Sequence, residues 1–342
     1  MRKPIVSFVI PLFNRETLVS ETLDSIVAQT RTDWECVVVD DGSTDASANV
    51  VERYAAKDSR IRLLHRPPGR IKGAPTCRNY GFENSSGTFV CFFDSDDLVG
   101  SSFLEAVLPA LEKELDAAYA VFPIDSFSGS LSTRRRPNQT RFNPRHGTLF
   151  EQLVSERIRS CTPSFLWRRS FLETLPMLWR EGLPCFQDPD FNRRSLCHAE
   201  HGIWIDMEPA VHYRFDATRS VGVVTASTKD PLARAKTVCF VHGEVYRYCV
   251  ETGRMTDRLH RLYTRYLFNV FFFHAVISRH PSVVREFYDL VVTHLDQTLP
   301  NRRLRLLTEA VFLGRPLFHA LGRLAGMFRS SIAHKIALFN PH

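Results

Sequence analysis

Four short and nearly continuous apolar runs alternate with helical patterns in the first hundred residues, and this alternation restricts the possible folds more than any other feature. The runs are 5–11 (IVSFVIP), 34–40 (WECVVVD), 60–66 (RIRLLHR) and 88–94 (TFVCFFD). Such runs are typical of parallel strands that are covered on both faces. Helix-spaced apolar residues lie between them, at 16–29, 45–56 and 77–87. A strand–helix–strand order repeated three times predicts an open, mainly parallel α/β sheet flanked by helices.

The pattern is less regular after residue 100. We expect helices at 102–115 and 149–156 and from about 188, strands at 117–124, 164–167, 202–206 and 210–215, and a long polar loop at 128–147. Beyond about residue 230 the pattern is helical. We therefore expect one α/β domain over 1–230, with halves at about 1–115 and 116–230, followed by a helical region over 231–342.

Polar and turn-forming residues follow each of the first four predicted strands. They are 11–14 (PLFN), 40–45 (DDGSTD), 66–75 (RPPGRIKGAP) and 94–97 (DSDD). Ligands of open α/β sheets bind outside the carboxyl ends of the strands. The sequence therefore predicts a binding site at this edge of the sheet.

Three carboxylates, those of Asp94, Asp96 and Asp97, lie within four residues at the end of the fourth strand. They repel one another, and burial would raise their pKa values unless a cation compensates. Mg²⁺ and Mn²⁺ prefer such oxygen ligands, often together with substrate phosphates. The alternative is that these residues form a turn and cap the next helix, but Ser102 and Glu105 are spaced for a capping box there. The segment thus favours a divalent metal site.

The second strand ends in Asp40 and Asp41. Because Ser43 or Thr44 can cap the following helix, these two carboxylates are predicted to have no structural task and to accept hydrogen bonds from a nucleobase or a ribose. Four cationic residues between the two acidic segments can contact a diphosphate or remain exposed loop charges: Arg66, Arg70, Lys72 and Arg78. Neither G-x-x-x-x-G-K-[ST] nor a G-x-G-x-x-G after the first strand is present.

In this order and spacing, the segments VSFVIPLFNRE, VVVDDGSTD and RNYGFENSSGTFVCFFDSDD resemble the family 2 glycosyltransferases with the GT-A fold. The resemblance covers residues 5–110 most strongly. It implies a nucleoside diphosphate sugar as donor, with a UDP-sugar favoured, and transfer with inversion. It places Asp94 and Asp96 in a D-x-D metal motif for Mg²⁺ or Mn²⁺. With the residues discussed above, the expected donor-binding set is Pro11, Phe13, Asn14, Asp40, Asp41, Lys72, Arg78, Asp94 and Asp97.

The same family carries a Glu-Asp pair at the start of a helix in its second half, in which the Asp acts as general base. Here the segment 185–196 (CFQDPDFNRRSL) has Gln187 in the first position and Asp188 in the second. Asp190 competes for the role, and either carboxylate can instead be a helix N-terminal charge. His212, in a segment that resembles the family's Tyr-Arg stretch, can complete the metal site or be a packed histidine.

Most of the formal charge of +7 lies in the last part of the chain, where 300–342 contain seven Lys or Arg and one Glu. Residues 315–332 have the pattern of a basic amphipathic helix, which suits an anionic membrane surface or packing on the catalytic domain. We expect a glycan or lipid-linked acceptor and no nucleic-acid partner, because the basic charge is not spread over a groove. Scattered cysteines and the absence of an apolar leader favour the cytoplasm, with possible attachment to the inner face of the membrane.

Two other functions fit parts of the pattern. A sugar-1-phosphate nucleotidyltransferase is also a metal-dependent α/β enzyme, but it needs a Gly-rich basic loop after the first strand, where PLFNRE has no glycine. A non-catalytic protein that binds nucleotide sugars or glycans would not need Asp188 together with an intact D-x-D segment.

Overall fold

The computed structural model describes residues 3–135, 141–158, 160–214 and 231–263. The chain divides into two compact units, residues 1–215 and 216–342. The domain boundary expected after residue 230 borders the segment 215–230, outside the described residues, and stays a prediction. The first unit contains both sheets and every predicted site residue. In the second unit, α9 spans Pro231–Glu251, in agreement with the helical pattern.

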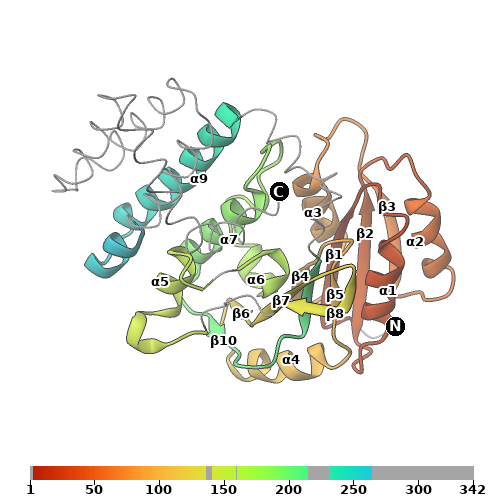
Figure 1. Ribbon diagram of the computed structural model, residues 1–342, viewed down its shortest axis with the longest axis horizontal. Coiled ribbons are helices and arrows are strands. Elements are labelled where there is room, and N and C mark those ends of the chain that lie inside the picture. Colours follow the sequence, from red (N-terminus) through yellow and green to blue (C-terminus); the bar gives the residue numbers. More distant parts are fainter. Residues whose placement is uncertain (1–2, 136–140, 159, 215–230, 264–342) are drawn as a thin grey trace. The chain divides into compact units, whose positions relative to one another are not determined.

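The first unit is built on a seven-stranded sheet in the order β10-β6-β9-β4-β1-β2-β3 (Figure 1). β1 pairs in parallel with β2 and β4, and β2 with β3. The strand β9 lies antiparallel between β4 and β6. The strand bounds are Val6–Leu12 (β1), Trp34–Asp40 (β2), Ile61–His65 (β3), Phe89–Phe92 (β4), Tyr119–Val121 (β6), Phe165–Arg168 (β9) and Ile203–Trp204 (β10).

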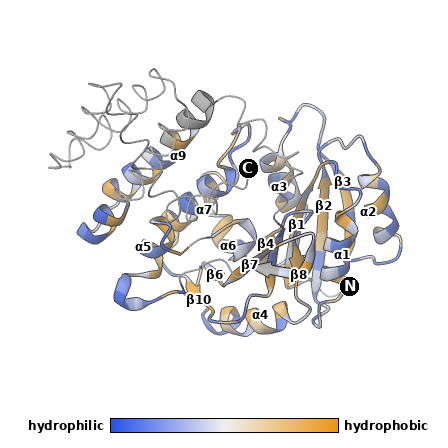
Figure 2. Cartoon of the chain, in the orientation of Figure 1, coloured by the Kyte–Doolittle hydropathy of each residue, from blue (hydrophilic) through white to orange (hydrophobic). Residues whose placement is uncertain are grey.

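Helices cover both faces of this sheet, as the apolar runs predict. Alternate residues of β1 and β2, among them Phe8 and Cys36, pack with buried residues of the helices α1, α2 and α4. The opposite face, with Val37 and Val39, packs against α3. The apolar colouring follows the strands in Figure 2. The helix bounds are Val19–Val27 (α1), Ser47–Ala55 (α2), Ala74–Glu83 (α3), Phe103–Lys113 (α4), Leu149–Val154 (α5), Arg169–Leu172 (α6) and Gln187–His198 (α7).

A second, four-stranded sheet has the order β5-β11-β7-β8. Its strands are Leu98–Val99 (β5), Val211–Arg214 (β11), Ile124–Ser128 (β7) and Ser130–Arg135 (β8). The single strand expected at 117–124 is therefore wrong. It divides into β6 and the start of β7, because Pro123 has no N–H to continue the ladder and the chain changes sheets there.

The polar loop expected at 128–147 is also partly wrong. β7 and β8 form a hairpin that turns at Gly129, whose φ of +69° suits a residue without a side chain. The polar residues of β8 can form a strand because β8 lies at the edge of this sheet. The Thr133 hydroxyl supports the turn by donating to the Ser128 carbonyl at 2.5 Å.

The capping box expected at the start of α4 is not formed. Ser102 makes no side-chain capping bond, and Glu105 instead accepts from the Thr30 hydroxyl at 2.9 Å. The first turn of α4 instead finds a hydrogen-bond acceptor outside the helix, because the Leu104 N–H donates to the Gln29 side-chain oxygen at 3.2 Å. Ser102 therefore does not replace the acidic segment 94–97 as a side-chain cap of α4, although no side-chain capping bond to α4 comes from that segment either.

Helix α3 lies unusually close to the sheet and ends earlier than expected, at Glu83 rather than near Gly87. A side chain at Gly81 would bring its Cβ to 2.5 Å from the Val9 Cγ1 atom. Glycine therefore allows the helix to contact β1 directly, because any larger residue would push the two elements apart.

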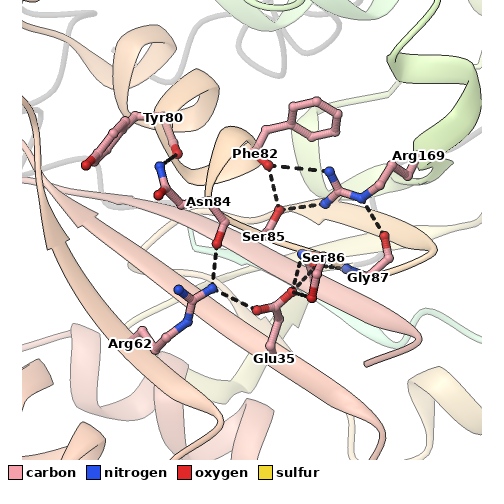
Figure 3. Close-up of polar contacts among 10 residues, drawn as sticks. Glu35, Arg62, Tyr80, Phe82, Asn84, Ser85, Ser86, Gly87 and Arg169 are labelled. Carbon is pink, nitrogen blue, oxygen red and sulfur yellow. Dashed lines mark hydrogen bonds and ion pairs between the residues drawn. The ribbon is translucent and has the colours of Figure 1, made fainter. Parts of the chain in front are cut away.

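A polar network fixes the turn between α3 and β4 (Figure 3). The buried Glu35 carboxylate of β2 accepts from the Ser86 N–H at 2.5 Å and hydroxyl at 3.1 Å, from the Ser7 hydroxyl at 2.9 Å and from Arg62 at 2.9 Å. Burial raises the pKa of Glu35, but these hydrogen bonds outweigh it and hold the pKa below its usual range.

Arg169 binds the same turn through other groups. Its guanidinium donates to the Gly87 and Phe82 carbonyls and to the Ser85 hydroxyl.

Within the described residues, no helix combines enough length and hydrophobicity to cross a membrane.

Candidate active site

The carboxyl ends of β1, β2 and β4 lie at one edge of the sheet, and the predicted segments 11–14, 40–45 and 94–97 meet there. Asn14 links the first two segments, because its N–H donates to the Ser43 hydroxyl at 3.1 Å and its side-chain oxygen accepts from the Thr44 N–H at 2.9 Å. Its backbone is left-handed, with a φ of 51°. Pro11 and Phe13 are partly buried beside it, and the Lys72 ammonium lies 3.9 Å from the centre of the Phe13 ring.

Asp40 and Asp41 both have structural partners, so the expectation that they are free of such tasks is wrong. The Asp40 carboxylate accepts from the N–H groups of Gly42 and Ser43 at 3.1 and 3.2 Å and closes the turn after β2. Asp41 pairs with the Arg66 guanidinium at 2.6 Å. Their predicted contacts with a nucleoside stay predictions.

The loop cations are likewise not all available to a ligand. Arg66 is paired with Asp41, and Arg70 binds Glu83 at 2.9 Å and Glu181 at 2.6 Å. Arg70 therefore joins two acidic groups on the protein. Lys72 and Arg78 are the members of this group that face other parts of the site.

Each carboxylate of the carboxylate cluster, defined as Asp94, Asp96 and Asp97, contacts an arginine. Two of these contacts are ion pairs, which offset part of the repulsion among three carboxylates within four residues. The pairs are Asp94 with Arg78 at 2.5 Å, Asp96 with Arg15 at 3.0 Å, and Asp97 with the backbone N–H of Arg214 at 2.8 Å. Arg214 also donates to the Asp96 carbonyl at 2.7 Å. Arg15 was not foreseen from the sequence, although it directly follows the predicted segment 11–14.

The carboxylate cluster has the chemistry that a hard divalent cation requires. Burial raises the pKa of Asp97, and the neighbouring Asp96 and Asp94 raise it further. Burial and Asp94 also raise the pKa of Asp96, against the opposing effect of Arg15. One oxygen of Asp97 is buried and has no hydrogen-bond partner. A cation at this position would stabilise the ionised forms, so the oxygen donors fit Mg²⁺ or Mn²⁺.

His212 contacts a different partner. Its Nδ1 atom lies 2.6 Å from the Asp125 carboxylate, between the adjacent strands β11 and β7, and both side chains are buried. A carboxylate commonly orients a metal-binding imidazole in this way. In the described part of the chain, however, the group of three ligand atoms within 4.8 Å of one another is the exposed set Glu114, Asp116 and His201. The metal role of His212 therefore stays a prediction.

The start of α7 separates the two candidate bases. Asp190 is buried and binds Arg180 at 3.3 Å and Arg194 at 2.8 Å, which is a structural task. Asp188 is only partly buried, and its carboxylate lies 3.7 Å from the guanidinium of Arg78. Burial raises the pKa of Asp188, Arg78 opposes the rise and Asp94 adds to it. The side chain of Gln187 donates to the Leu183 carbonyl at 3.0 Å.

Arg78 connects the two halves of the site. Its side chain is 4% exposed and lies between Asp94 and Asp188, with the guanidinium carbon 4.4 Å from the centre of the Trp179 ring. Its Nε and Nη1 atoms are buried and have no hydrogen-bond partner. Buried guanidinium donors without partners suit an anionic ligand group. The sequence placed Arg78 in the site but gave no signal for Trp179.

Comparisons with known proteins agree with this geometry. Residues 7–175 match the model of the family described as Glycosyl transferase family 2. The chain is 30% identical over 214 residues to the uncharacterized glycosyltransferase EpsJ of Bacillus subtilis, covering 59% of each protein. It is 35% identical over 95 residues to the putative teichuronic acid biosynthesis glycosyltransferase TuaG of the same organism, covering 28% of this chain and 37% of that protein. The chain thus spans less than two thirds of the length of these relatives.

A solved structure extends the likeness to the fold. Staphylococcus aureus TarS 1–349, in complex with UDP-GlcNAc, superposes with a TM-score of 0.67 at 16% identity, over 85% of this chain and 82% of that one. At this identity the likeness concerns the fold, which is the GT-A type expected from the sequence. Residues 7–175 therefore carry the pattern of glycosyl transferase family 2, on the fold that the sequence predicts.

Proposed function

We propose that this chain transfers a sugar from a nucleoside diphosphate sugar to an acceptor hydroxyl, with inversion at the anomeric carbon. The observation that carries the proposal is the position of Arg78 between Asp94 and Asp188. Asp94, a candidate metal ligand, and Asp188, a candidate base, thereby face the same buried guanidinium. This guanidinium lies at the sheet edge where α/β proteins bind ligands.

The donor would lie across the ends of β1, β2 and β4. Pro11, Phe13 and Asn14 would border the nucleoside, and Asp40 and Asp41 would meet the base or the ribose. Lys72 and Arg78 would face the diphosphate, and Asp94 and Asp97 the sugar or the ribose. A UDP-sugar is favoured, since the similar TarS structure holds UDP-GlcNAc.

Mg²⁺ or Mn²⁺ would be held by Asp94 and Asp96, with His212 as a third candidate ligand. When bound, the ion supplies positive charge that offsets the charge developing on the departing nucleoside diphosphate. The chain's own contribution is the arrangement of arginines. Arg15, Arg78 and Arg214 keep the carboxylate cluster in place, and the free donors of Arg78 are available to the phosphates.

Asp188 would act as the general base. It would take the proton of the acceptor hydroxyl, which attacks the anomeric carbon from the face opposite the nucleoside diphosphate. Burial raises the pKa of Asp188 and makes it a stronger base, while Arg78 favours its ionised form. Asp190 is engaged with two arginines and is not available for this role. No covalent intermediate with the enzyme is needed.

A screen of nucleotide sugars tests the proposal. We expect release of the nucleoside diphosphate from one of the UDP-, GDP- or dTDP-sugars in the presence of Mn²⁺ or Mg²⁺, and loss of this release in Asp96→Ala. If the unchanged chain binds donors but releases no product when acceptor sugars are added, the proposal is refuted in favour of a binding protein. Formation of pyrophosphate from a nucleoside triphosphate and a sugar 1-phosphate would instead identify a nucleotidyltransferase.

We further propose a glycan or lipid-linked acceptor in the synthesis of a surface polysaccharide or glycoconjugate. The similarity to TuaG, whose name refers to teichuronic acid biosynthesis, supports this class. The basic amphipathic pattern at 315–332 lies outside the described residues and, with the expected cytoplasmic location, supports attachment to the inner face of the membrane. Flotation with anionic liposomes should be reduced when residues 300–342 are removed, and equal flotation would contradict the attachment.

A further inference from the structure

Trp179 occupies the centre of the packing beneath the site. It lies between α6 and α7, and its side chain is 2% exposed. Its ring stacks on Phe191 at 4.1 Å between ring centres and meets the edge of Phe92 at 5.3 Å. The guanidinium of Arg78 covers the ring at 4.4 Å. One indole therefore contacts α7, β4 and α3 together.

Each of these three neighbours is next to a residue of the proposed reaction. Arg78 contacts both Asp94 and Asp188. Phe92 ends β4, two residues before Asp94, and Phe191 lies on α7 about one turn after Asp188. The position of the indole thus affects the donor side and the acceptor side of the site at once.

Asn79 fixes the backbone at Trp179. Its side-chain nitrogen donates to the Trp179 carbonyl and its side-chain oxygen accepts from the Trp179 N–H, both at 2.9 Å. The same nitrogen donates to Glu181 at 3.0 Å, and Glu181 pairs with Arg70 at 2.6 Å. An amide side chain offers a donor and an acceptor in the geometry of a backbone, which explains why asparagine suits this position.

We propose that Trp179 and Asn79 are positioning residues for sugar transfer, with Asn79 fixing Trp179 and the indole holding Arg78 and α7 so that Asp94 and Asp188 face the same guanidinium. The inference rests on the proposed function. Neither residue is expected to touch the donor. Their effect on the rate arises because a shift of about 1 Å between reacting groups can lower a rate by about 100-fold.

The test compares Trp179→Leu, Trp179→Phe and Asn79→Ser with the matched control Trp34→Leu. Trp34 is equally buried and is also covered by a guanidinium, that of Arg60 at 3.8 Å, but it begins β2 at the opposite end from Asp40. Turnover is measured as release of nucleoside diphosphate from the sugar donor that the unchanged chain uses best in the screen above, and is normalised to folded protein.

We expect turnover to fall by about 100-fold in Trp179→Leu and by about 10-fold in Asn79→Ser. Trp179→Phe keeps an aromatic face for Arg78 and Phe191, and should stay within about fivefold of the unchanged chain. Trp34→Leu should lose stability but keep its turnover. Equal turnover in Asn79→Ser and the unchanged chain, or an equal loss in Trp34→Leu and Trp179→Leu, would overturn the proposal.

Hydrogen exchange provides a readout that does not depend on catalysis. In Asn79→Ser, the amides of 187–192 should exchange faster relative to the amides of β1 than they do in the unchanged chain, and in Trp34→Leu this ratio should not rise. Unchanged exchange in Asn79→Ser would refute the positioning role even for a variant that is well folded. If the proposed function itself is wrong, the unchanged chain will show no turnover. That outcome is therefore distinct from a failure of the positioning role.

Discussion

Replacing Glu35 tests whether the network beneath α3 stabilises the fold by the contacts described. The residue is 8% exposed, and one of its carboxylate oxygens, Oε1, accepts from Ser7 and from the N–H and hydroxyl of Ser86. Among the described residues, the other oxygen, Oε2, accepts from Arg62 alone, whose side chain is 43% exposed. The two oxygens therefore make unequal contributions, because the exposed Arg62 and Ser86 recover their hydrogen bonds from water and the buried Ser7 hydroxyl does not.

These contacts give different magnitudes for two substitutions. Glu35→Gln can place its oxygen in the Oε1 position and turn its amide toward Arg62, so we expect a loss of about 1 kcal/mol in the free energy of unfolding. Glu35→Ala leaves the buried Ser7 hydroxyl without its acceptor and turns the exposed Ser86 donors over to water, and we expect a loss of about 2–3 kcal/mol.

Urea unfolding followed by circular dichroism measures both values, with Glu52→Ala on the exposed face of α2 as control. The control should stay within about 0.5 kcal/mol. Because the folded pKa of Glu35 is lowered, the advantage of the unchanged chain over Glu35→Gln should be complete above the unfolded value of about 4.3 and should disappear as the pH falls through the folded pKa. Equal losses in Glu35→Ala and Glu52→Ala would refute the reasoning.

Three further predictions concern the site and α3. Asp188→Asn should lower turnover by about 100- to 10,000-fold. The activity of the unchanged chain should decline at acid pH through a pKa above that of an ordinary Asp, because the base must be ionised. Asp190→Asn should chiefly lower the melting temperature. Removal of divalent ions with EDTA should abolish turnover and Mn²⁺ should restore it, whereas Asp96→Ala should bind Mn²⁺ at least about tenfold more weakly in calorimetry. Gly81→Ala should lose about 1–3 kcal/mol in urea unfolding, because its Cβ would lie 2.5 Å from Val9; a neutral effect would contradict the close contact.

The main sheet could be predicted from the sequence because its strands are buried on both faces and read as continuous apolar runs. The place of the site could be predicted because polar residues follow these apolar runs directly, at Asp40 after the second run and at Asp94 after the fourth. The second sheet as a whole was not predicted because most of its strands are short or polar, although its strand β11 agrees with the strand expected at 210–215. Pro123 was the available signal for the break between β6 and β7, since proline interrupts a ladder.

Within the site, the residue types were more predictable than their partners. The acidic segment 94–97 and Asp188 follow from local motifs. The ion pair between Arg15 and Asp96 joins residues 81 positions apart, and Asn79 reaches Trp179 over 100 positions. Such contacts depend on how distant elements pack, and one sequence contains no periodic signal for them. Capping was misjudged in the same way, because Gln29 satisfies α4 from outside the helix.

The consecutive positions of Arg78 and Asn79 on α3 have a consequence for how this site can vary. Successive residues of a helix point about 100° apart, so one residue reaches the acidic groups while the next reaches the backbone at Trp179. The rotational setting of the helix is fixed by Gly81 against Val9. Inserting or deleting one residue between Asn79 and Gly81 would turn both side chains away from their partners together. The spacing from Arg78 to Gly81 therefore behaves as a fixed length in the design of the site.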